Sequence, residues 1–201
     1  MPCEDSDGPR AARAAGQRAA GRGSDPVSRR AAAIEAILLD VDGVLTDGTF
    51  EPGDEAAGIP ERKRFHSRDG LGLVMAKKSG LRLGFVTGRR SGIVRGRAAE
   101  LSLDYLREGC FDKGPAFDEA CASFGLLPEQ VAFVGDDVQD LPALRKAGFA
   151  AAPADAHPAV LQSVHFVADA PGGRGAVRQI IERILEARGL LDAALFRFWG
   201  H

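Results

Sequence analysis

Acidic residues stand directly after two apolar segments of this sequence. Asp40 and Asp42 follow the apolar run that ends at Leu39, and a second group of acids lies within residues 135–140, after the apolar residues 131–134. An i, i+2 pair in extended geometry projects Asp40 and Asp42 to the same side. Converging carboxylates repel, so they need a cation or a shared proton, and hard oxygen ligands favour Mg²⁺.

Each acidic group taken alone also has an ordinary structural interpretation. Asp-Gly pairs and Asp doublets are common in turns and at helix N-caps. Two such groups at the ends of apolar segments favour a site, because ligands of open parallel sheets bind beyond the carboxyl ends of the strands. The sequence therefore predicts a magnesium site to which both groups contribute.

Two further features supply what phosphoryl chemistry requires. Thr87, Gly88 and Arg89 end a third apolar run, and the glycine would let backbone N–H groups approach a phosphate. Lys113 offers a compact cation just before a helical stretch. A Thr-Gly-Arg sequence is a weak signal by itself, and a single lysine is usually a solvated surface residue. Their order between the two acidic groups is what favours a phosphate site.

The elements that must position these residues follow an alternating pattern. From Ile34 onward, short apolar runs bounded by Gly or Asp alternate with stretches of helical period, which predicts an α/β fold: a doubly wound, Rossmann-like, mostly parallel sheet with helices on both faces. Strands are expected at Ile34–Leu39, Leu81–Val86, Asp104–Leu106, Val131–Val134, Phe149–Ala152 and Val164–Val167. Helices are expected at Leu71–Ser79, Ser91–Leu101, Lys113–Phe124, Leu141–Ala147 and Ala176–Ala187.

Three segments depart from this alternation. Residues 1–33 are rich in Ala, Arg, Gly, Ser and Pro without hydrophobic period, which predicts a disordered tail before a domain that spans residues 34–201. Residues 46–65 fit a small β-hairpin flap with no large cap domain. The C-terminal segment, residues 176–201, ends in an aromatic cluster that includes Trp199, which suggests docking on this or a neighbouring subunit.

Composition excludes several classes of function. The 201 residues are 45% apolar, which is enough for one substantial core, and no apolar run approaches the ~20 residues of a membrane span. A formal net charge of -2 argues against nucleic acid as a partner. The three cysteines are too few and too scattered for a disulfide framework, so we expect reduced thiols and a cytoplasmic setting.

The acidic, Thr-Gly and lysine motifs together resemble those of a known family. In chain order they are Asp40-x-Asp42-Gly43-x-x-x-Asp47-Gly48, Thr87-Gly88-Arg89, Lys113 and Gly135-Asp136-Asp137-x-x-Asp140. As a set they resemble the four motifs of the haloacid dehalogenase superfamily of phosphatases. The resemblance spans nearly everything from Ile34 to Arg188.

Further stretches narrow the resemblance to the subclass without a large cap. They are Arg64-Phe65-His66-Ser67-Arg68-Asp69-Gly70, Ala154-Asp155-Ala156-His157-Pro158 and Gly172-Gly173-Arg174-Gly175. The chain looks closest to the 3-deoxy-D-manno-octulosonate 8-phosphate phosphatases, enzymes of lipopolysaccharide precursor synthesis, although related sugar-acid phosphatases share versions of these stretches. It departs from that pattern in the tail before Ile34 and at His66-Ser67, where relatives often carry an amide or other small residues.

The resemblance implies a magnesium-dependent phosphomonoesterase with an aspartyl-phosphate intermediate. Asp40 would be the nucleophile, and Asp42 would be general acid and then general base. Mg²⁺ would be held by the Asp40 side chain, the Asp42 backbone carbonyl and Asp136. Thr87 and Lys113 would bind the non-bridging phosphate oxygens. Asp137 and Asp140 would act nearby: one of them could reach the metal through water, or Asp140 could instead orient Lys113.

Substrate recognition would fall to arginines and to other subunits. Arg89, Arg68, Arg64 and Arg174 are the candidates for the sugar-acid end, because a guanidinium can grip a carboxylate with two parallel bonds. His157 and His165 are expected to be structural. A short flap could hardly shield the phosphoaspartate alone, so the resemblance implies a homotetramer whose flaps and C-terminal tails cover neighbouring sites.

Two other functions remain open at the level of sequence. The first is the same reaction on a nonulosonate 9-phosphate, which keeps the carboxylate but differs in chain length. The second is a catalytically silent homologue that serves as a binding or assembly module, although every acidic and basic position the chemistry requires is occupied. A mutase or transferase would need an acceptor other than water, and no separate acceptor domain is visible.

Overall fold

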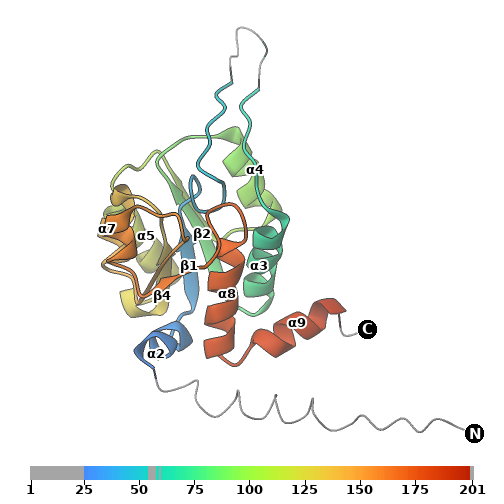
Figure 1. Ribbon diagram of the computed structural model, residues 1–201, viewed down its shortest axis with the longest axis vertical. Helices are drawn as coiled ribbons and strands as arrows, with labels where there is room; N and C mark the ends of the chain where they lie inside the picture. The colour runs from blue at the N-terminus through green and yellow to red at the C-terminus, as the bar shows by residue number, and fades with distance from the viewer. Residues whose placement is uncertain (1–24, 54–57, 59, 200–201) are drawn as a thin grey trace, which may run out of the picture.

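A six-stranded, entirely parallel sheet forms the centre of the protein (Figure 1). The computed structural model describes residues 25–53, 58 and 60–199. The strand order is β3-β2-β1-β4-β5-β6. The strands are β1 (Ala36–Leu39), β2 (Arg82–Thr87), β3 (Tyr105–Glu108), β4 (Val131–Val134), β5 (Phe149–Ala152) and β6 (Phe166–Val167). The predicted parallel, doubly wound α/β fold without a large cap is confirmed.

Helices cover both faces of this sheet. The longer ones are α3 (Ser67–Lys78), α4 (Gly92–Glu100), α5 (Lys113–Phe124), α8 (Ala176–Ala187) and α9 (Leu191–Trp199). The short ones are α2 (Pro26–Ala32), α6 (Leu141–Leu144), α7 (Pro158–Leu161) and the 3₁₀ turns η1 (Pro128–Gln130) and η2 (Val138–Asp140). One core joins α3, α4 and α8 to the first sheet face, and a second core joins α5, α6 and α7 to the other.

The register of the sheet brings the two acidic groups together. β1 lies between β2 and β4, and Leu39, its last residue, stands opposite Phe85 of β2 and Val134 of β4. The N–H of Asp40 donates to the Val134 carbonyl at 2.9 Å, so pairing with β4 continues one residue beyond β1. Every residue of β1 and β4 is buried, which is typical of central parallel strands. Both acidic groups therefore emerge at the same edge of the sheet.

The predicted disordered tail extends too far into the folded part. Residues 26–32 form α2, which begins at Asp25 as N-cap and Pro26 in the first turn. Ala31 and Ser28 are buried, and the guanidinium of Arg183 on α8 donates to the Ser28 hydroxyl at 2.7 Å. Hydrophobic periodicity does not predict this helix, because small residues form its buried face. Residues 1–24 of the predicted tail lie outside the described residues.

Several predicted boundaries shift by a few residues. α3 begins at Ser67 because the His66 side chain accepts a hydrogen bond from the Arg68 N–H at 3.2 Å. α6 ends at Leu144 instead of Ala147, and β6 is two residues long instead of four. The bounds of β4, β5, α5 and α8 are those predicted.

The flap is less regular than the predicted hairpin. Its described residues contain one isolated antiparallel bridge, between Glu51 and Arg62, in place of two strands. Figure 1 shows its two arms rising from the carboxyl edge of the sheet. At the other end of the chain, α9 buries Ala194 but leaves Phe196 60% exposed. No helix in the described part of the chain is long and apolar enough to cross a membrane.

Candidate active site

Asp40 is held at the end of β1 with one carboxylate oxygen fixed and the other without a partner. Its side chain is almost fully buried. Oδ1 accepts a hydrogen bond from the Val41 N–H at 2.7 Å and lies 2.9 Å from Nζ of Lys113. Oδ2 is buried and has no hydrogen-bond partner within the part of the chain that the structure describes. Burial raises the pKa of Asp40, Lys113 opposes this effect and the Asp140 carboxylate adds to it, with a net result of about 7.

Lys113 is a buried cation between two aspartates. Its side chain is 0% exposed at the start of α5, and Nζ lies 2.7 Å from Oδ1 of Asp140. Burial alone would lower the pKa of Lys113, but the carboxylates of Asp40 and Asp140 outweigh burial and raise it, so the ammonium stays charged. The other oxygen of Asp140 accepts the N–H groups of Asp136 and Asp137, at 2.9 and 3.2 Å. The geometry thus favours the interpretation in which Asp140 orients Lys113.

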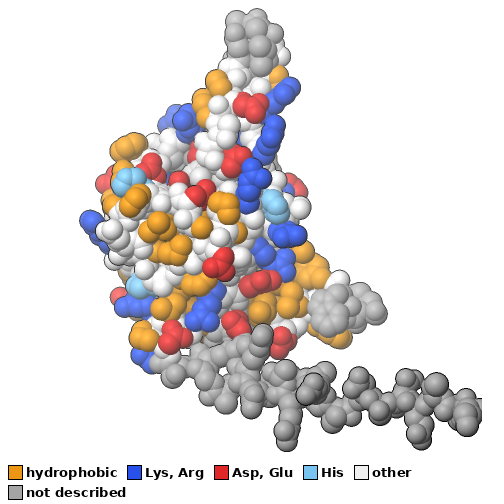
Figure 2. Space-filling model, in the orientation of Figure 1, with side chains coloured by type: hydrophobic (Ala, Val, Ile, Leu, Met, Phe, Trp, Pro, Cys, Tyr) orange, Lys and Arg blue, Asp and Glu red, His pale blue; other side chains and the backbone are white. Residues whose placement is uncertain are grey.

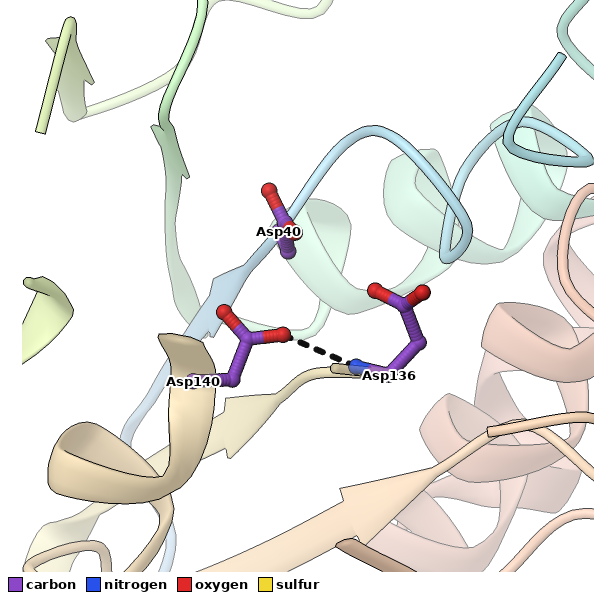
Figure 3. Close-up of side chains that lie close together, drawn as sticks. All are labelled: Asp40, Asp136 and Asp140. Carbon is purple, nitrogen blue, oxygen red and sulfur yellow. Dashed lines mark hydrogen bonds between the residues drawn. The ribbon is translucent and has the colours of Figure 1, made fainter. Parts of the chain in front are cut away.

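Asp136 completes a group of carboxylates around a common point. Oxygen atoms of Asp40, Asp136 and Asp140 lie within 4.8 Å of one another, and Figure 3 shows the three side chains converging from β1, from the loop after β4 and from η2. Oδ1 of Asp136 is buried without a hydrogen-bond partner among the described residues. Burial and the charges of Asp40 and Asp140 raise the pKa of Asp136 to about 8.

This arrangement fits a divalent metal. Two unpartnered buried oxygens, one from Asp40 and one from Asp136, are costly unless a cation or a proton satisfies them. All donors are hard carboxylate oxygens, the set that Mg²⁺ prefers. The Asp42 side chain is not part of this group, so any contribution of Asp42 to the metal would come from its backbone carbonyl.

The loop after β1 packs against Asp136 through a glycine. Gly43 has φ +88°, and a Cβ atom at this position would overlap the Asp136 carboxylate. The loop before α8 supports it from the other side: a Cβ on Gly172 would overlap the Gly43 carbonyl, and the Gly173 N–H donates to the Val44 carbonyl at 2.9 Å. The Gly172–Gly175 stretch therefore braces the loop that carries Asp42.

Asp69, on α3, holds the Gly172–Gly175 loop in place. Its carboxylate is buried and accepts the N–H groups of Gly175 and Arg178 at 3.0 and 2.9 Å, so it caps the start of α8. Burial raises the pKa of Asp69 despite these hydrogen bonds. Asp69 and the Gly-rich loop act here as structural parts of the site.

Asp42 faces the flap. Oδ1 of its carboxylate contacts Nζ of Lys63, and Oδ2 lies 3.8 Å from Nε of Arg89. Lys63 is a residue of the site that sequence reasoning missed. The only signal was its place in the charged run before Phe65, which gave no reason to prefer Lys63 over its arginine neighbours.

A cavity of about 360 Å³ opens over these residues. Thr87 lies in it at the end of β2, with its buried hydroxyl accepting the Arg89 N–H at 3.3 Å. The cavity brings together most of the predicted residues and adds Phe111 and Gln139, which sequence reasoning had not selected. It is lined by Asp40, Asp42, Gly48, Thr87, Gly88, Arg89, Phe111, Asp136, Asp137 and Gln139.

The other candidate arginines lie elsewhere within one subunit. Arg68 and Arg174 line a separate cavity of about 420 Å³ beside α8, and Arg64 lines a small one on the flap. On the face drawn in Figure 2, basic side chains run along one arm of the flap and continue towards α3. Of the four arginines, Arg89 alone shares the cavity with Asp40. The other three follow the flap and α8 away from the sheet edge, and their part in binding the sugar-acid end stays a prediction.

The two histidines have structural contacts. Nδ1 of His157 accepts the Ala159 N–H at 3.1 Å as the N-cap of α7, and the His157 N–H donates to the Asp136 carbonyl at 2.7 Å. Nδ1 of His165 accepts the Ala150 N–H at 2.8 Å, and burial lowers the pKa of this ring. The structural interpretation of both residues is confirmed.

Comparison with known proteins points to one group of enzymes. The family model of haloacid dehalogenase-like hydrolases matches residues 67–148. The 3-deoxy-D-manno-octulosonate 8-phosphate phosphatase KdsC of Yersinia pestis is 40% identical over 171 residues, which cover 85% of this chain and 90% of that protein. Its crystal structure has a TM-score of 0.80 to this chain and covers 84% of it, with 89% of that structure covered.

A second structure carries ligands. The 3-deoxy-D-manno-octulosonate 8-phosphate phosphatase of Moraxella catarrhalis, in complex with a magnesium ion, a phosphate ion and a KDO molecule, has a TM-score of 0.82 and 34% identity. The match covers 87% of this chain and 99% of that one.

Proposed function

This chain belongs to the haloacid dehalogenase-like hydrolases and, among them, to the 3-deoxy-D-manno-octulosonate 8-phosphate phosphatases, and we propose that it hydrolyses that sugar-acid phosphate with Asp40 as nucleophile. The observation that carries the assignment of Asp40 is its geometry. Asp40 is buried at the cavity floor, with Oδ1 held by Lys113 and Val41 and Oδ2 left without a partner. The products are the free sugar acid, a precursor of lipopolysaccharide, and phosphate.

The reaction proceeds by two transfers at phosphorus. An oxygen of Asp40 attacks the phosphoryl group, the bond from phosphorus to the sugar oxygen breaks, and an aspartyl-phosphate forms. Water then attacks phosphorus and releases phosphate from Asp40. The fixed position of Oδ1 holds the carboxylate plane in one orientation, so no rotation has to be restricted during the attack.

Asp40 and Asp136 would hold Mg²⁺ with their unpartnered oxygens, together with the Asp42 carbonyl. Bound there, Mg²⁺ neutralises charge between the carboxylates and the phosphate. The raised pKa values of Asp40 and Asp136 have the same cause, since each carboxylate lacks a compensating cation where it is buried.

Thr87 and Lys113 would bind the non-bridging oxygens of the phosphoryl group. Thr87 lines the cavity, and the Lys113 ammonium lies 2.9 Å from Oδ1 of Asp40; both residues are almost fully buried. Because a loose phosphoryl transition state spreads charge over these oxygens, fixed donors stabilise it more than the ground state. Asp140 holds Lys113 in place, and Asp137 caps η2.

Asp42 would serve the leaving group and then the water. As acid it gives a proton to the sugar oxygen when that oxygen leaves phosphorus, and as base it takes a proton from the attacking water. Its carboxylate lines the cavity and is partly exposed, so it can exchange protons with bound molecules.

Arg89 would bind the carboxylate of the sugar acid within the same subunit, because it lines the cavity. Arg64, Arg68 and Arg174 would act on a neighbouring subunit's substrate, in a cytoplasmic homotetramer. Exposed Phe196 and Phe198 on α9 support such an assembly. Light scattering that found a fully active monomer would overturn this part of the proposal.

A panel of sugar phosphates, with and without Mg²⁺ and read out as phosphate release, tests the function. We expect release only with Mg²⁺, and the highest kcat/KM on 3-deoxy-D-manno-octulosonate 8-phosphate. A preference of about a hundredfold for a nine-carbon nonulosonate 9-phosphate would refute the substrate while leaving the chemistry intact. Absence of turnover on every ester would instead support a silent homologue.

A further inference from the structure

The side chain of Lys63, on the flap, is buried. It is 1% exposed, although the described part of the flap is irregular and contains one isolated antiparallel bridge. Burying an ammonium is costly unless it is paired. The partner of Lys63 is Oδ1 of Asp42, and the next carboxylate oxygen, on Glu61, is 3.9 Å away. The flap therefore places a cation against the residue proposed as acid and base.

The surroundings of Lys63 leave Asp42 in one orientation. Arg89 lies on the other oxygen of Asp42, with Nε 3.8 Å from Oδ2. The Phe50 ring lies under both cations: the Arg89 guanidinium carbon is 4.0 Å and the Lys63 Nζ is 5.8 Å from the ring centroid. Each oxygen of Asp42 is thus matched to one cation, and an aromatic ring from the first flap arm holds the two cations side by side.

The flap is tied to the body of the protein at a second point next to Lys63. Oε2 of Glu61 accepts a hydrogen bond from the Ser91 hydroxyl at 2.8 Å, and Ser91, two residues after Arg89, caps α4. This contact fixes the arm that carries Lys63 relative to Arg89.

We propose that Lys63 is a positioning residue that holds Asp42 in the orientation needed for proton transfer to the leaving oxygen. The inference rests on the proposed function. In the first transfer a bond forms between Asp40 and phosphorus, the bond to the ester oxygen breaks, and the Asp42 proton moves to that oxygen. Lys63 contacts Oδ1, whereas Nε of Arg89 is 3.8 Å from Oδ2, which is longer than a hydrogen bond, so Oδ2 is the oxygen that can carry this proton.

The dependence of kcat/KM on the leaving group separates this role from a structural one. An aryl oxide of low basicity leaves without a proton, whereas a sugar alkoxide requires one. For Lys63→Met we expect kcat/KM to fall about a hundredfold on the sugar phosphate and less than about fivefold on p-nitrophenyl phosphate. A series of aryl phosphates should show a steeper dependence on leaving-group basicity for Lys63→Met than for the unaltered protein.

Conservative and control variants complete the test. Lys63→Arg should restore the shallow leaving-group dependence, because it returns a cation to Asp42. Lys77→Met is the matched control: Lys77 forms an ion pair with Asp104 at 2.6 Å, with both side chains about a third exposed and remote from the cavity. Lys77→Met should leave kcat/KM unchanged on both the sugar phosphate and p-nitrophenyl phosphate. If Lys63→Met does not fold, Lys63→Gln keeps the stem and a polar end for the same comparison.

Each outcome bears on one proposal. An equal loss on both kinds of ester, or no loss on either, would overturn the role of Lys63 as a positioning residue. Failure of the unaltered protein to hydrolyse any ester would overturn the proposed function instead. If kcat/KM of Lys63→Arg depended on leaving-group basicity as steeply as that of Lys63→Met, the charge alone would not position Asp42.

Discussion

Two buried lysines contact the two aspartates of the first acidic group, and their settings differ. Lys113 starts a helix and binds Asp40 and Asp140, which are themselves buried at the sheet edge. Lys63 sits on the flap and binds Asp42, whose side chain is 24% exposed. The sheet edge is therefore a buried charge cluster, whereas the flap contact joins Asp42 to a separate, irregular segment. The proposed mechanism places phosphorus chemistry at the first region and proton transfer at the second.

Asp40→Asn should give the largest effect and tests the sheet edge. We expect kcat to fall by at least about 10⁴-fold, because the amide cannot form an aspartyl-phosphate. Thermal unfolding in the absence of Mg²⁺ should show an unchanged or higher Tm, since one of the repelling buried charges is removed. Magnesium-dependent turnover at the original rate would rule out Asp40 as the nucleophile.

Lys113→Met should damage stability as well as turnover, which distinguishes the sheet edge from the flap. The variant leaves Asp140 buried without its cation, a loss of about 3–5 kcal/mol in the free energy of unfolding. Lys63→Met should cost less than about 1 kcal/mol, because water reaches the partly exposed Asp42. Urea unfolding of both variants measures the difference. Equal losses would mean that the flap contact is as integral to the fold as the edge cluster.

The sheet edge could be predicted from the sequence because its residues follow buried strands. Asp40 comes directly after β1 and Asp136 two residues after the end of β4, and the pairing of central parallel strands leaves little choice in where they meet. The interpretation of Asp140 stayed open because two roles fit the same spacing. Its contacts with Lys113 and with two backbone N–H groups favour the orienting role only once side chains are placed.

The flap and the arginines were harder to predict, for a physical reason. The position of Lys63 depends on how an irregular segment folds back over the loop after β1, and no period in the sequence encodes that contact. Arg64, Arg68 and Arg174 were selected by residue type and by the stretches that carry the resemblance, and neither determines where a side chain points. α2 was missed because its buried face is made of small residues, for which burial adds little to the hydrophobic pattern.

Mg²⁺ and pH should both change the stability of the protein through the carboxylates of Asp40 and Asp136. The pKa values of Asp40 and Asp136, about 7 and about 8, lie above the ordinary aspartate value of 3.8. The folded protein without metal thus holds protons that the unfolded chain releases, so its stability should fall as pH rises from about 4 to about 8. Mg²⁺ replaces those protons, so its stabilising effect should grow over the same window.

Tm measured at about pH 5 and about pH 8, with and without Mg²⁺, tests this coupling. At about a hundred times its Kd, Mg²⁺ should add about 2.7 kcal/mol near pH 8 and much less near pH 5. Asp136→Asn should reduce both the pH dependence and the response to Mg²⁺. A Mg²⁺ effect that is equal at both pH values would contradict the assignment of Asp40 and Asp136 as the metal's ligands.

Arg89→Gln should have the smallest effect and tests where the two regions meet. Arg89 lines the cavity of the sheet edge, yet it also stacks on Phe50 of the flap and faces Asp42. If it binds the sugar-acid carboxylate, the variant should raise KM about tenfold on the sugar acid and leave p-nitrophenyl phosphate nearly unchanged, because that ester has no carboxylate. If Arg89 instead helps Lys63 to orient Asp42, kcat on the sugar phosphate would fall and KM would stay unchanged. The ratio of the two changes therefore decides whether Arg89 belongs functionally to substrate recognition or to the flap contact.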